Sequence, residues 1–558
     1  MSSNRLPIIQ PIPVPSGPPK YELLKESILE EFAAKVPLNL RISASCIAKP
    51  PRNVTSIPHE CGILSSEEID ITENFDATAL ASAIASKKFS AVSVATAFSK
   101  RAIIAHQVTC CLTEWFMDEA IQQAQALDDH LEATGRTLGP LHGIPISIKE
   151  HIPLAGHWSS VGFLDTRTKD EEDCQMIAIL RKAGAVFYCK TVQPQSLMHL
   201  ESDSIYGRVL NPYNINLSAG GSTGGEAALI AMRGSVLGVG TDIGGSIRAP
   251  ASFCGIYGFK ATSYTLPMKD FIPGGFAAEL NILCSTGPMA HSLRDMDLFM
   301  SVVSSAQPHL KDPRLVPIPW TGLRSPTTAP LKIGLMTSDG VISPQPPVAR
   351  ALAWARTKLD NSNRFQVKTF EPYKVATAMR QISLAYFPDG GKTLKTHLQK
   401  TGEPCFPLTK WVIREGEGTE LTSQGVLEQR LLRDQFRCAF AEYWESQDVD
   451  VVLCPTYVGP APIHETAFFW NYTAFWNYVD YPGVVFPTPI KAQSAGIEKY
   501  ATSDSTPLSD NCKYVRHLWE REDYQGAPIN LQLVARKYYD SDLFAALGAI
   551  EEALELDR

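Results

Sequence analysis

The sequence predicts an α/β protein in which helices cover a central sheet, preceded by a mainly helical region. Two observations lead to this fold class. From about residue 140 onward, apolar segments with strand character alternate with helical segments, a rhythm typical of a layered α/β core. Before that point, apolar residues recur mainly at helical spacing. We therefore expect sheet strands that deliver loops to one edge of the core.

Composition narrows the functional classes. The chain has 558 residues, of which 44% are hydrophobic and 20% charged, as in an ordinary globular protein. Length alone would suggest three or four domains. The net charge of −8 argues against a nucleic-acid partner or an anionic membrane surface. No apolar run approaches the roughly 18 residues that a membrane helix needs.

Residues 1–20 contain six prolines and no continuous apolar core, so we expect an extended arm and neither a signal nor a transit peptide. The twelve cysteines show neither metal nor disulfide spacing. Without a secretory signal, they are interpreted as reduced thiols. We expect a cytoplasmic protein with no metal and no cofactor.

The region 21–135 is predicted to be mainly helical. Within residues 21–36, apolar side chains stand four apart, and Pro37 follows. Further helices are predicted at 77–86, 91–106 and 118–134. These helices are expected to pack and to carry no chemistry.

The α/β alternation extends to the C-terminus. Strands are predicted at 143–149, 185–190, 236–240, 332–336, 365–370, 449–453 and 528–535. Helices are predicted at 174–183, 226–232, 348–359, 375–386, 424–446 and 543–556. A proline-rich connection spans 308–330, and residues 492–512 form a polar surface excursion. Residues 464–478 carry seven aromatic rings, which suit either the core or a pocket.

Two serines dominate the functional interpretation. Ser222 and Ser246 each follow a Gly-Gly pair and lie 24 residues apart, separated by a predicted helix and strand. Glycine lets the backbone turn its N–H groups toward a ligand. A Gly-Gly-Ser loop can therefore stabilise an oxyanion beside a hydroxyl group. A single such loop is more often a tight turn, but two so close together favour a catalytic role.

Shorter motifs compete with this interpretation. Residues 220–224 fit the G-x-S-x-G nucleophile elbow, which requires a strand just before the serine. Residues 211–218 are predicted as coil, which argues against an elbow. Residues 391–393 resemble part of a phosphate-binding loop, but Tyr386 occupies the position of its first glycine. Two β-lactamase-like triplets, at 509–511 and 400–402, stand in reversed order and are interpreted as coincidence.

A serine nucleophile needs a base, and no histidine lies in a motif that nominates it. Lys149 ends an apolar strand, where burial would favour its neutral form. Ser–Lys arrangements are known variants of the catalytic triad. A lysine at a strand end is usually solvated, so these patterns alone leave its role open.

Three stretches, at 143–150, 220–226 and 240–248, resemble the amidase signature family, most closely its fungal acetamidase-type members. Similarity extends from about residue 21 to the C-terminus. The resemblance implies one large α/β/α domain over 21–558, built around a mixed twisted sheet. Within it, the catalytic motifs occupy 136–265, and 266–558 supply the rest of the core and the substrate pocket.

The resemblance also implies roles by position. Ser246 is expected to be the acyl-accepting nucleophile, and Ser222, on a cis peptide, to pass its proton to Lys149. The oxyanion hole is expected from the backbone N–H groups of Ile243, Gly244, Gly245 and Ser246.

Three supporting residues complete the expected site. Thr223 stands where the family usually has a second serine and keeps a hydroxyl group. Asp242 and Arg248 flank the oxyanion loop and could fix it by hydrogen bonding, or could be an ordinary surface pair. The chain departs from the family pattern at Val192, Ala219 and Ala261. None of these belongs to the triad, but Val192 and Ala219 could reshape the loops around it. A specialised substrate is therefore plausible.

The function expected from these residues is hydrolysis of the C–N bond of a small carboxamide through an acyl-enzyme. The alternative is the catalytic subunit of an ammonia-transferring complex. Acetamide-like, aryl and longer acyl amides would all suit one triad, so the motifs do not identify the substrate. A homodimer is expected by resemblance only.

Overall fold

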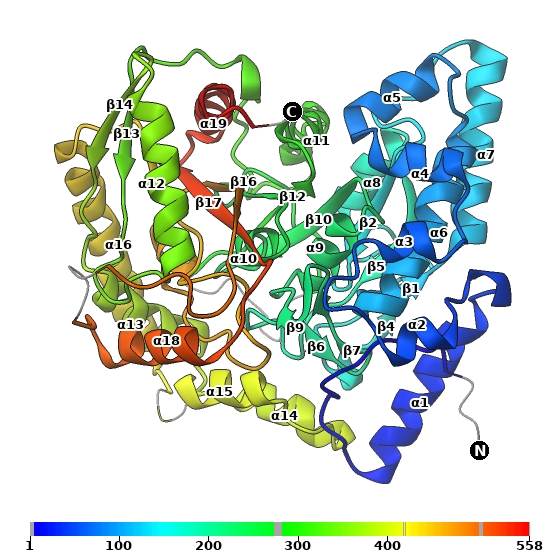
Figure 1. Cartoon of the computed structure of the whole chain (residues 1–558), viewed down its shortest axis with the longest axis horizontal. Coiled ribbons are helices and arrows are strands. Elements are labelled where there is room, and N and C mark those ends of the chain that lie inside the picture. Colours follow the sequence, from blue (N-terminus) through cyan, green and yellow to red (C-terminus); the bar gives the residue numbers. More distant parts are fainter. Residues whose placement is uncertain (1–4, 273–281, 417, 419, 502–505, 557–558) are drawn as a thin grey trace.

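The computed structural model describes residues 5–272, 282–416, 418, 420–501 and 506–556, and they form an eleven-stranded mixed sheet with helices packed against it (Figure 1). The strand order is β1-β5-β2-β10-β12-β11-β16-β17-β15-β13-β14. The predicted α/β class is therefore confirmed, with parallel and antiparallel pairs in the same sheet.

The first half of the sheet carries the catalytic motifs. Its strands are β1 (Leu112–Trp115), β5 (Val186–Thr191), β2 (Pro145–Lys149), β10 (Leu237–Asp242), β12 (Ser285–Ala290) and β11 (Tyr257–Lys260). β2 runs parallel to both β5 and β10, with Ile148 opposite Val239. The carboxyl ends of parallel strands meet at one edge. Lys149 and Asp242, the last residues of β2 and β10, therefore end at the same edge.

The second half extends the sheet through antiparallel pairing of β11 with β16. Its strands are β16 (Gly483–Lys491), β17 (Pro528–Ala535), β15 (Val451–Pro455), β13 (Leu331–Leu335) and β14 (Phe365–Thr369). Three two-stranded sheets lie outside the main sheet. They pair β3 (Trp158–Ser159) with β4 (Thr168–Lys169), β6 (Asp203–Ser204) with β7 (Gly207–Arg208), and β8 (Leu210–Asn211) with β9 (Asn214–Ser218).

The N-terminal region is mainly helical and contributes β1 to the sheet. It contains α1 (Pro19–Ala34), α2 (Ala44–Ala48), α3 (Ile57–Glu60), α4 (Ser66–Glu73), α5 (Ala77–Ala85), α6 (Ala91–Thr109) and α7 (Met117–Thr134). α6 is buried along most of its length, and α6 and α7 both pack on β5. The described part of the arm is tied to this region, since the N–H of Ile9 donates to the carbonyl of Gln107 at 3.0 Å.

The remaining helices lie between or after the later strands, and four of them, α13 to α16, follow one another between β14 and β15. They are α8 (Gln175–Lys182), α9 (Gly224–Ala231), α10 (Arg248–Phe253), α11 (Leu293–Ser305), α12 (Pro346–Asp360), α13 (Val375–Tyr386), α14 (Lys392–Thr401), α15 (Pro407–Gly416), α16 (Ser423–Ser446), α17 (Asn471–Val479), α18 (Asp510–Arg521) and α19 (Asp540–Leu554). Within the proline-rich connection, the chain forms two short 3₁₀ turns at Pro308–Leu310 and Gly322–Arg324.

The aromatic stretch at 464–478 serves the core and a cavity at once. Its C-terminal part is α17, whose residues are all buried. Trp476 and Tyr472 are among the largest fully buried side chains of the protein. Phe468, Phe469 and Trp470, just before the helix, instead line a cavity. The two interpretations of this stretch therefore apply to different residues.

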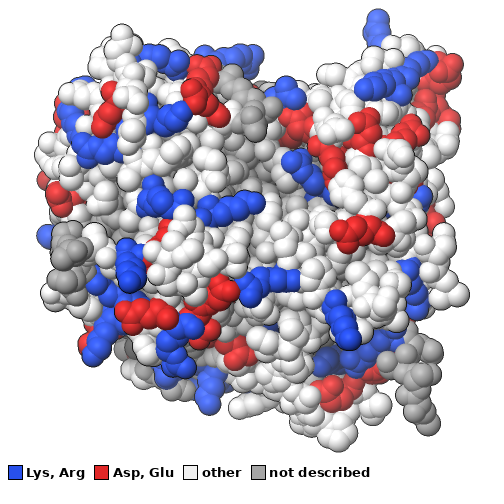
Figure 2. Space-filling view, in the orientation of Figure 1, with Lys and Arg blue, Asp and Glu red and all other residues white. Residues whose placement is uncertain are grey.

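Charged groups of both signs are interspersed over the face seen in Figure 2. Among the described residues, no helix has the length and apolarity that crossing a membrane requires.

Candidate active site

Ser222 lies in a tight loop between β9 and α9. The structure corrects the coil predicted at 211–218, because β9 pairs with β8 as a hairpin and ends four residues before Ser222. Gly220 has a φ of +88°, and a side chain at Gly221 would meet the carbonyl oxygen of His199 at 2.5 Å. Glycine is therefore required at both positions. The Gly221–Ser222 peptide is cis, as the resemblance implied.

Lys149 reaches this loop from the end of β2. Its side chain is fully buried, and its Nζ atom lies 2.6 Å from Ser222 Oγ. Nζ also lies 3.0 Å from Thr223 Oγ1 and 3.0 Å from Thr241 Oγ1. Three hydroxyl groups thus surround the amine, and among the described residues no carboxylate forms an ion pair with it.

Burial lowers the pKa of Lys149 to about 7, while nearby acidic groups, among them Asp242 and Glu226, act in the opposite direction. Desolvation was predicted to favour the neutral amine, and burial acts in that direction here. Glu150 bonds to the Ser160 hydroxyl instead, in keeping with strand alternation.

Ser246 follows β10 in the loop that leads into α10. The Thr223 N–H donates to the Ser246 carbonyl at 3.1 Å, so the two serine loops are joined through their backbones. The Ser246 and Ser222 side chains are both nearly buried, at 5% and 3% exposure. The structure thus brings the three predicted triad residues into one region.

The carbonyl groups of the oxyanion loop are held by defined partners. Tyr386 Oη donates to the Ile243 carbonyl at 2.6 Å, and Thr473 Oγ1 donates to the Gly244 carbonyl at 2.8 Å. The Ala249 N–H donates to the Gly245 carbonyl at 2.7 Å. In a planar trans peptide, the N–H points away from the carbonyl. Fixing these carbonyls therefore fixes the direction of the N–H groups of the loop.

One expected oxyanion donor is corrected by the structure. The Gly245 N–H donates to Asp242 Oδ1 at 2.8 Å, so it faces a carboxylate of the protein. Within the described part of the chain, the N–H groups of Ile243, Gly244 and Ser246 have no acceptor. Of the four expected donors, these three are left to face a substrate oxygen.

Asp242 and Arg248 form a buried pair beneath the loop, not a surface pair. Arg248 Nη2 lies 3.0 Å from Asp242 Oδ1, and both side chains have no exposed surface. The carboxylate also accepts the N–H groups of Gly245, Ile247 and Arg248. Burial alone would raise the pKa of Asp242, but the Arg248 charge and hydrogen bonds hold it well below its usual range.

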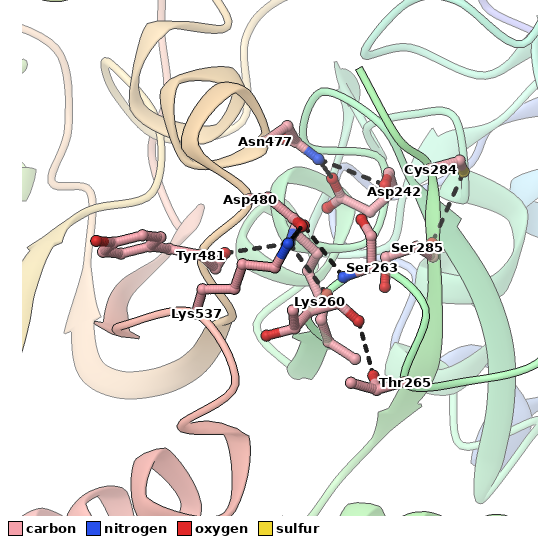
Figure 3. Close-up of polar contacts among 12 residues, drawn as sticks. Asp242, Lys260, Ser263, Thr265, Cys284, Ser285, Asn477, Asp480, Tyr481 and Lys537 are labelled. Carbon is pink, nitrogen blue, oxygen red and sulfur yellow. Dashed lines mark hydrogen bonds and ion pairs between the residues drawn. The ribbon is translucent and has the colours of Figure 1, made fainter. Parts of the chain in front are cut away.

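A second buried network lies beside this pair (Figure 3). Asn477 of α17 donates to Asp242 Oδ1 at 2.9 Å. Asp480, just past the same helix, lies 2.8 Å from Lys537 Nζ and 3.9 Å from Lys260 Nζ. Lys260 is the last residue of β11, so these contacts join the end of α17 to β11.

Several of these residues were missed from the sequence. Thr241 stands next to Asp242 in the motif at 240–248, and this position could have identified it as a site residue. Tyr386, Thr473 and Asn477 lie more than a hundred residues from the loop that they hold, and no local pattern marks them.

A cavity of about 710 Å³ has Tyr386 and Trp470 in its wall. Its lining residues belong to α13, α15, the segment before α17, and α18. Met379, Tyr386 and Trp470 are among them. A side chain at Gly244 would meet Tyr386 Oη at 2.7 Å and the Trp470 ring at 3.3 Å. Tyr386 and Trp470 therefore contact the loop directly.

Comparison with known proteins identifies the family of this chain. The family model described as Amidase matches residues 93–544, which include both serine loops and Lys149. The chain belongs to the amidase family. It is therefore an enzyme, and amide hydrolysis is the reaction that its family supports.

Similar amidases occur in fungi. The chain is 41% identical over 504 residues to a Schizosaccharomyces pombe protein named as a candidate amidase, covering 90% of this amidase and 93% of that protein. It is 34% identical to the acetamidase of Aspergillus oryzae over 499 residues, covering 87% and 90% of the two chains.

Solved structures extend the comparison. The amidase superposes on fatty acid amide hydrolase with a TM-score of 0.87 and 33% identity, covering 97% of this chain and 95% of that one. A bacterial aryl acylamidase superposes with a TM-score of 0.67 over 86% of this chain and 96% of its own. At 20% identity, the second likeness shows the fold alone.

Proposed function

We propose that this amidase hydrolyses the C–N bond of a carboxamide through an acyl-enzyme formed on Ser246, with Ser222 and Lys149 transferring the proton. The observation that carries the proposal is the 2.6 Å contact between Lys149 Nζ and Ser222 Oγ, in a loop bonded to the backbone of Ser246. A buried, neutral lysine is a base that can accept a proton near pH 7.

In the first step, Ser246 Oγ attacks the substrate carbonyl carbon. The Ser246 proton passes to Ser222 Oγ, and the Ser222 proton passes to Lys149 Nζ. The carbonyl π electrons move to the oxygen, which the N–H groups of Ile243, Gly244 and Ser246 stabilise.

In the second step, the C–N bond breaks and leaves the acyl group on Ser246. The departing nitrogen takes a proton back through Ser222 from Lys149. Water then attacks the ester, with proton transfer along the same route, and releases the carboxylate and free Ser246. The products are a carboxylic acid and ammonia or an amine.

The acyl group of the substrate is proposed to be apolar and to occupy the 710 Å³ cavity. Aromatic and aliphatic side chains dominate its wall, and Tyr386 and Trp470 connect that wall to the oxyanion loop. The similarity to fatty acid amide hydrolase, whose name specifies fatty acid amides, supports this choice.

A panel of primary amides tests the proposal. Acetamide, benzamide and a series of straight-chain amides are compared by ammonia release from the purified chain. We expect kcat/KM to rise with acyl length. Equal activity on acetamide and the long amides would contradict the apolar acyl site. If release required a partner protein, the chain would instead be a subunit of a larger assembly.

A further inference from the structure

We propose that Gln193 and His151 are positioning residues that orient the Thr241 hydroxyl beside Lys149, so that the lysine lone pair faces Ser222. This inference rests on the proposed function and adds two residues to it. A chain of hydrogen bonds leads from Gln193 through His151 and Thr241 to the lysine.

The orientation of the Gln193 amide is fixed at one end. Its Nε2 lies 2.7 Å from the Ser160 carbonyl oxygen, which can only accept. The NH₂ group must therefore face Ser160, and Oε1 must face His151. Gln193 is fully buried, so no solvent contact competes with this arrangement.

The amide oxygen then selects the tautomer of His151. Gln193 Oε1 lies 2.9 Å from His151 Nδ1, and an amide oxygen can only accept. Nδ1 must carry a hydrogen. The ring is neutral, because burial lowers its pKa well below the usual value. Its Nε2 atom is therefore an acceptor.

His151 in turn sets the direction of Thr241. Nε2 lies 3.4 Å from Thr241 Oγ1, so the threonine hydroxyl donates to the ring. Its oxygen is left as an acceptor for Lys149, which lies 3.0 Å away. The Thr223 hydroxyl is oriented in the same way. It donates to the Thr241 carbonyl at 3.3 Å, so its oxygen, 3.0 Å from Lys149, is left as an acceptor.

The remaining step is a count of hydrogens on a neutral lysine amine, which has two N–H bonds and one lone pair. Thr241 and Thr223 accept the two N–H bonds. The lone pair is left for the third neighbour, Ser222 Oγ, at 2.6 Å. Ser222 therefore donates its proton toward Lys149, which is the direction that catalysis requires.

The charged and titratable groups around Lys149 and His151 do not reverse these hydrogen-bond directions. Lys149 experiences the fields of Cys284, Asp242, Glu150 and Glu226, and His151 those of Lys149 and Lys190. The ring of Phe271 stands edge-on to His151 at 6.0 Å between centroids. No described carboxylate contacts His151, so Gln193 is the group that selects its tautomer.

The tautomer can be observed directly in the wild-type protein labelled with ¹⁵N-histidine. The His151 signals are identified by their loss in His151→Phe. We expect a protonated Nδ1 and an unprotonated Nε2. A protonated Nε2 in the wild type would overturn the inference, whatever the activity of any variant.

Gln193→Met provides the kinetic test. Without the amide oxygen, the ring can carry its hydrogen on Nε2, and Thr241 can then donate to the Lys149 lone pair. We expect kcat to fall about 3- to 10-fold with KM unchanged. The acid limb of the pH profile should move to lower pH, because the ammonium form of Lys149 then loses Thr241 as an acceptor, whereas the lone pair of the neutral amine keeps a donor. Loosened packing that admitted water would instead move the limb to higher pH.

Gln175→Met is the matched control, because that buried side chain donates to the Pro308 carbonyl at 2.8 Å in a different part of the fold. We expect it to keep the wild-type kcat and pH profile. A folded Gln193→Met variant with wild-type kinetics would overturn the inference, while Lys149→Ala would remain inactive. Full activity of Lys149→Ala would instead overturn the proposed function.

Discussion

Tyr386, at the end of α13, donates a 2.6 Å hydrogen bond to the carbonyl of Ile243, which lies 143 residues earlier in the chain. Tyr386 also lines the 710 Å³ cavity. One phenol group thus links the wall of the proposed acyl site to the peptide that carries the Gly244 N–H, one of the proposed oxyanion donors.

Tyr386→Phe removes this bond and leaves the ring in place. Because the peptide plane between Ile243 and Gly244 is then less restrained, we expect kcat to fall about 3- to 10-fold with a small change in KM. Tyr188→Phe is the control, since that buried tyrosine donates to the Gly234 carbonyl at 2.7 Å outside the loop. Equal losses in the two variants would argue against a special role for Tyr386.

Ser246 is predicted to be the residue that carries the acyl group. After treatment with a fluorophosphonate, mass spectrometry should find the adduct on the peptide that contains Ser246. Ser246→Ala should abolish both labelling and turnover, while Ser222→Ala should slow labelling because the relay is broken. An adduct on Ser222 would revive the nucleophile-elbow interpretation.

Lys149 is predicted to set the acid limb of the pH profile. Its pKa is lowered to about 7 by burial, so the neutral, catalytic form is gained as pH rises through about 7 and lost below it. Activity should therefore fall as the pH drops below neutral. Measurements of the hydrolysis rate from pH 5 to 9 check this prediction, and a flat pH profile would contradict it.

Substitution of Lys149 separates charge from basicity. Lys149→Ala should remove nearly all turnover, since Ser222 has no other base. Lys149→Arg should not restore activity, because a guanidinium group stays protonated. Circular dichroism should show that both variants fold. A substantial residual rate in folded Lys149→Ala would disprove the triad assignment.

The Asp242–Arg248 pair is predicted to support the fold as well as the loop. Asp242→Ala leaves the Arg248 charge buried beside only neutral partners, which costs about 3–5 kcal/mol. We expect a clearly lower Tm together with reduced turnover. The exposed pair Lys87–Glu132 is a suitable contrast, and Lys87→Ala should change stability by less than about 1 kcal/mol. An Asp242→Ala variant with wild-type Tm and rate would contradict both roles.

Met379→Trp is predicted to shorten the acyl group that the enzyme accepts. The larger side chain partly fills the cavity that Met379 lines. The kcat/KM for long-chain amides should drop at least tenfold, while small amides serve as the internal control and keep their rate. A uniform loss for all amides would indicate damage to the loop and not to the acyl site.

The sequence by itself determined the α/β class, most helices of the core, and the motif residues Lys149, Ser222 and Ser246. Local periodicity predicted the strand that ends at Lys149, and the Gly-Gly-Ser spacing indicated the two loops. It failed for residues 211–218, where two short strands pair with each other in a hairpin. The proline and the asparagines of this stretch are typical of turns, and they outweighed the short polar–apolar alternation at 214–218.

Only the tertiary structure decided which groups face which within the site. The Gly245 N–H is taken by Asp242, and Tyr386, Thr473, Gln193 and His151 act on loops far away in sequence. The physical reason is that a buried hydrogen bond depends on the direction and distance of both partners. Those are set by the pairing of β2 with β10 and by the packing of α13 and α17, which no local pattern encodes.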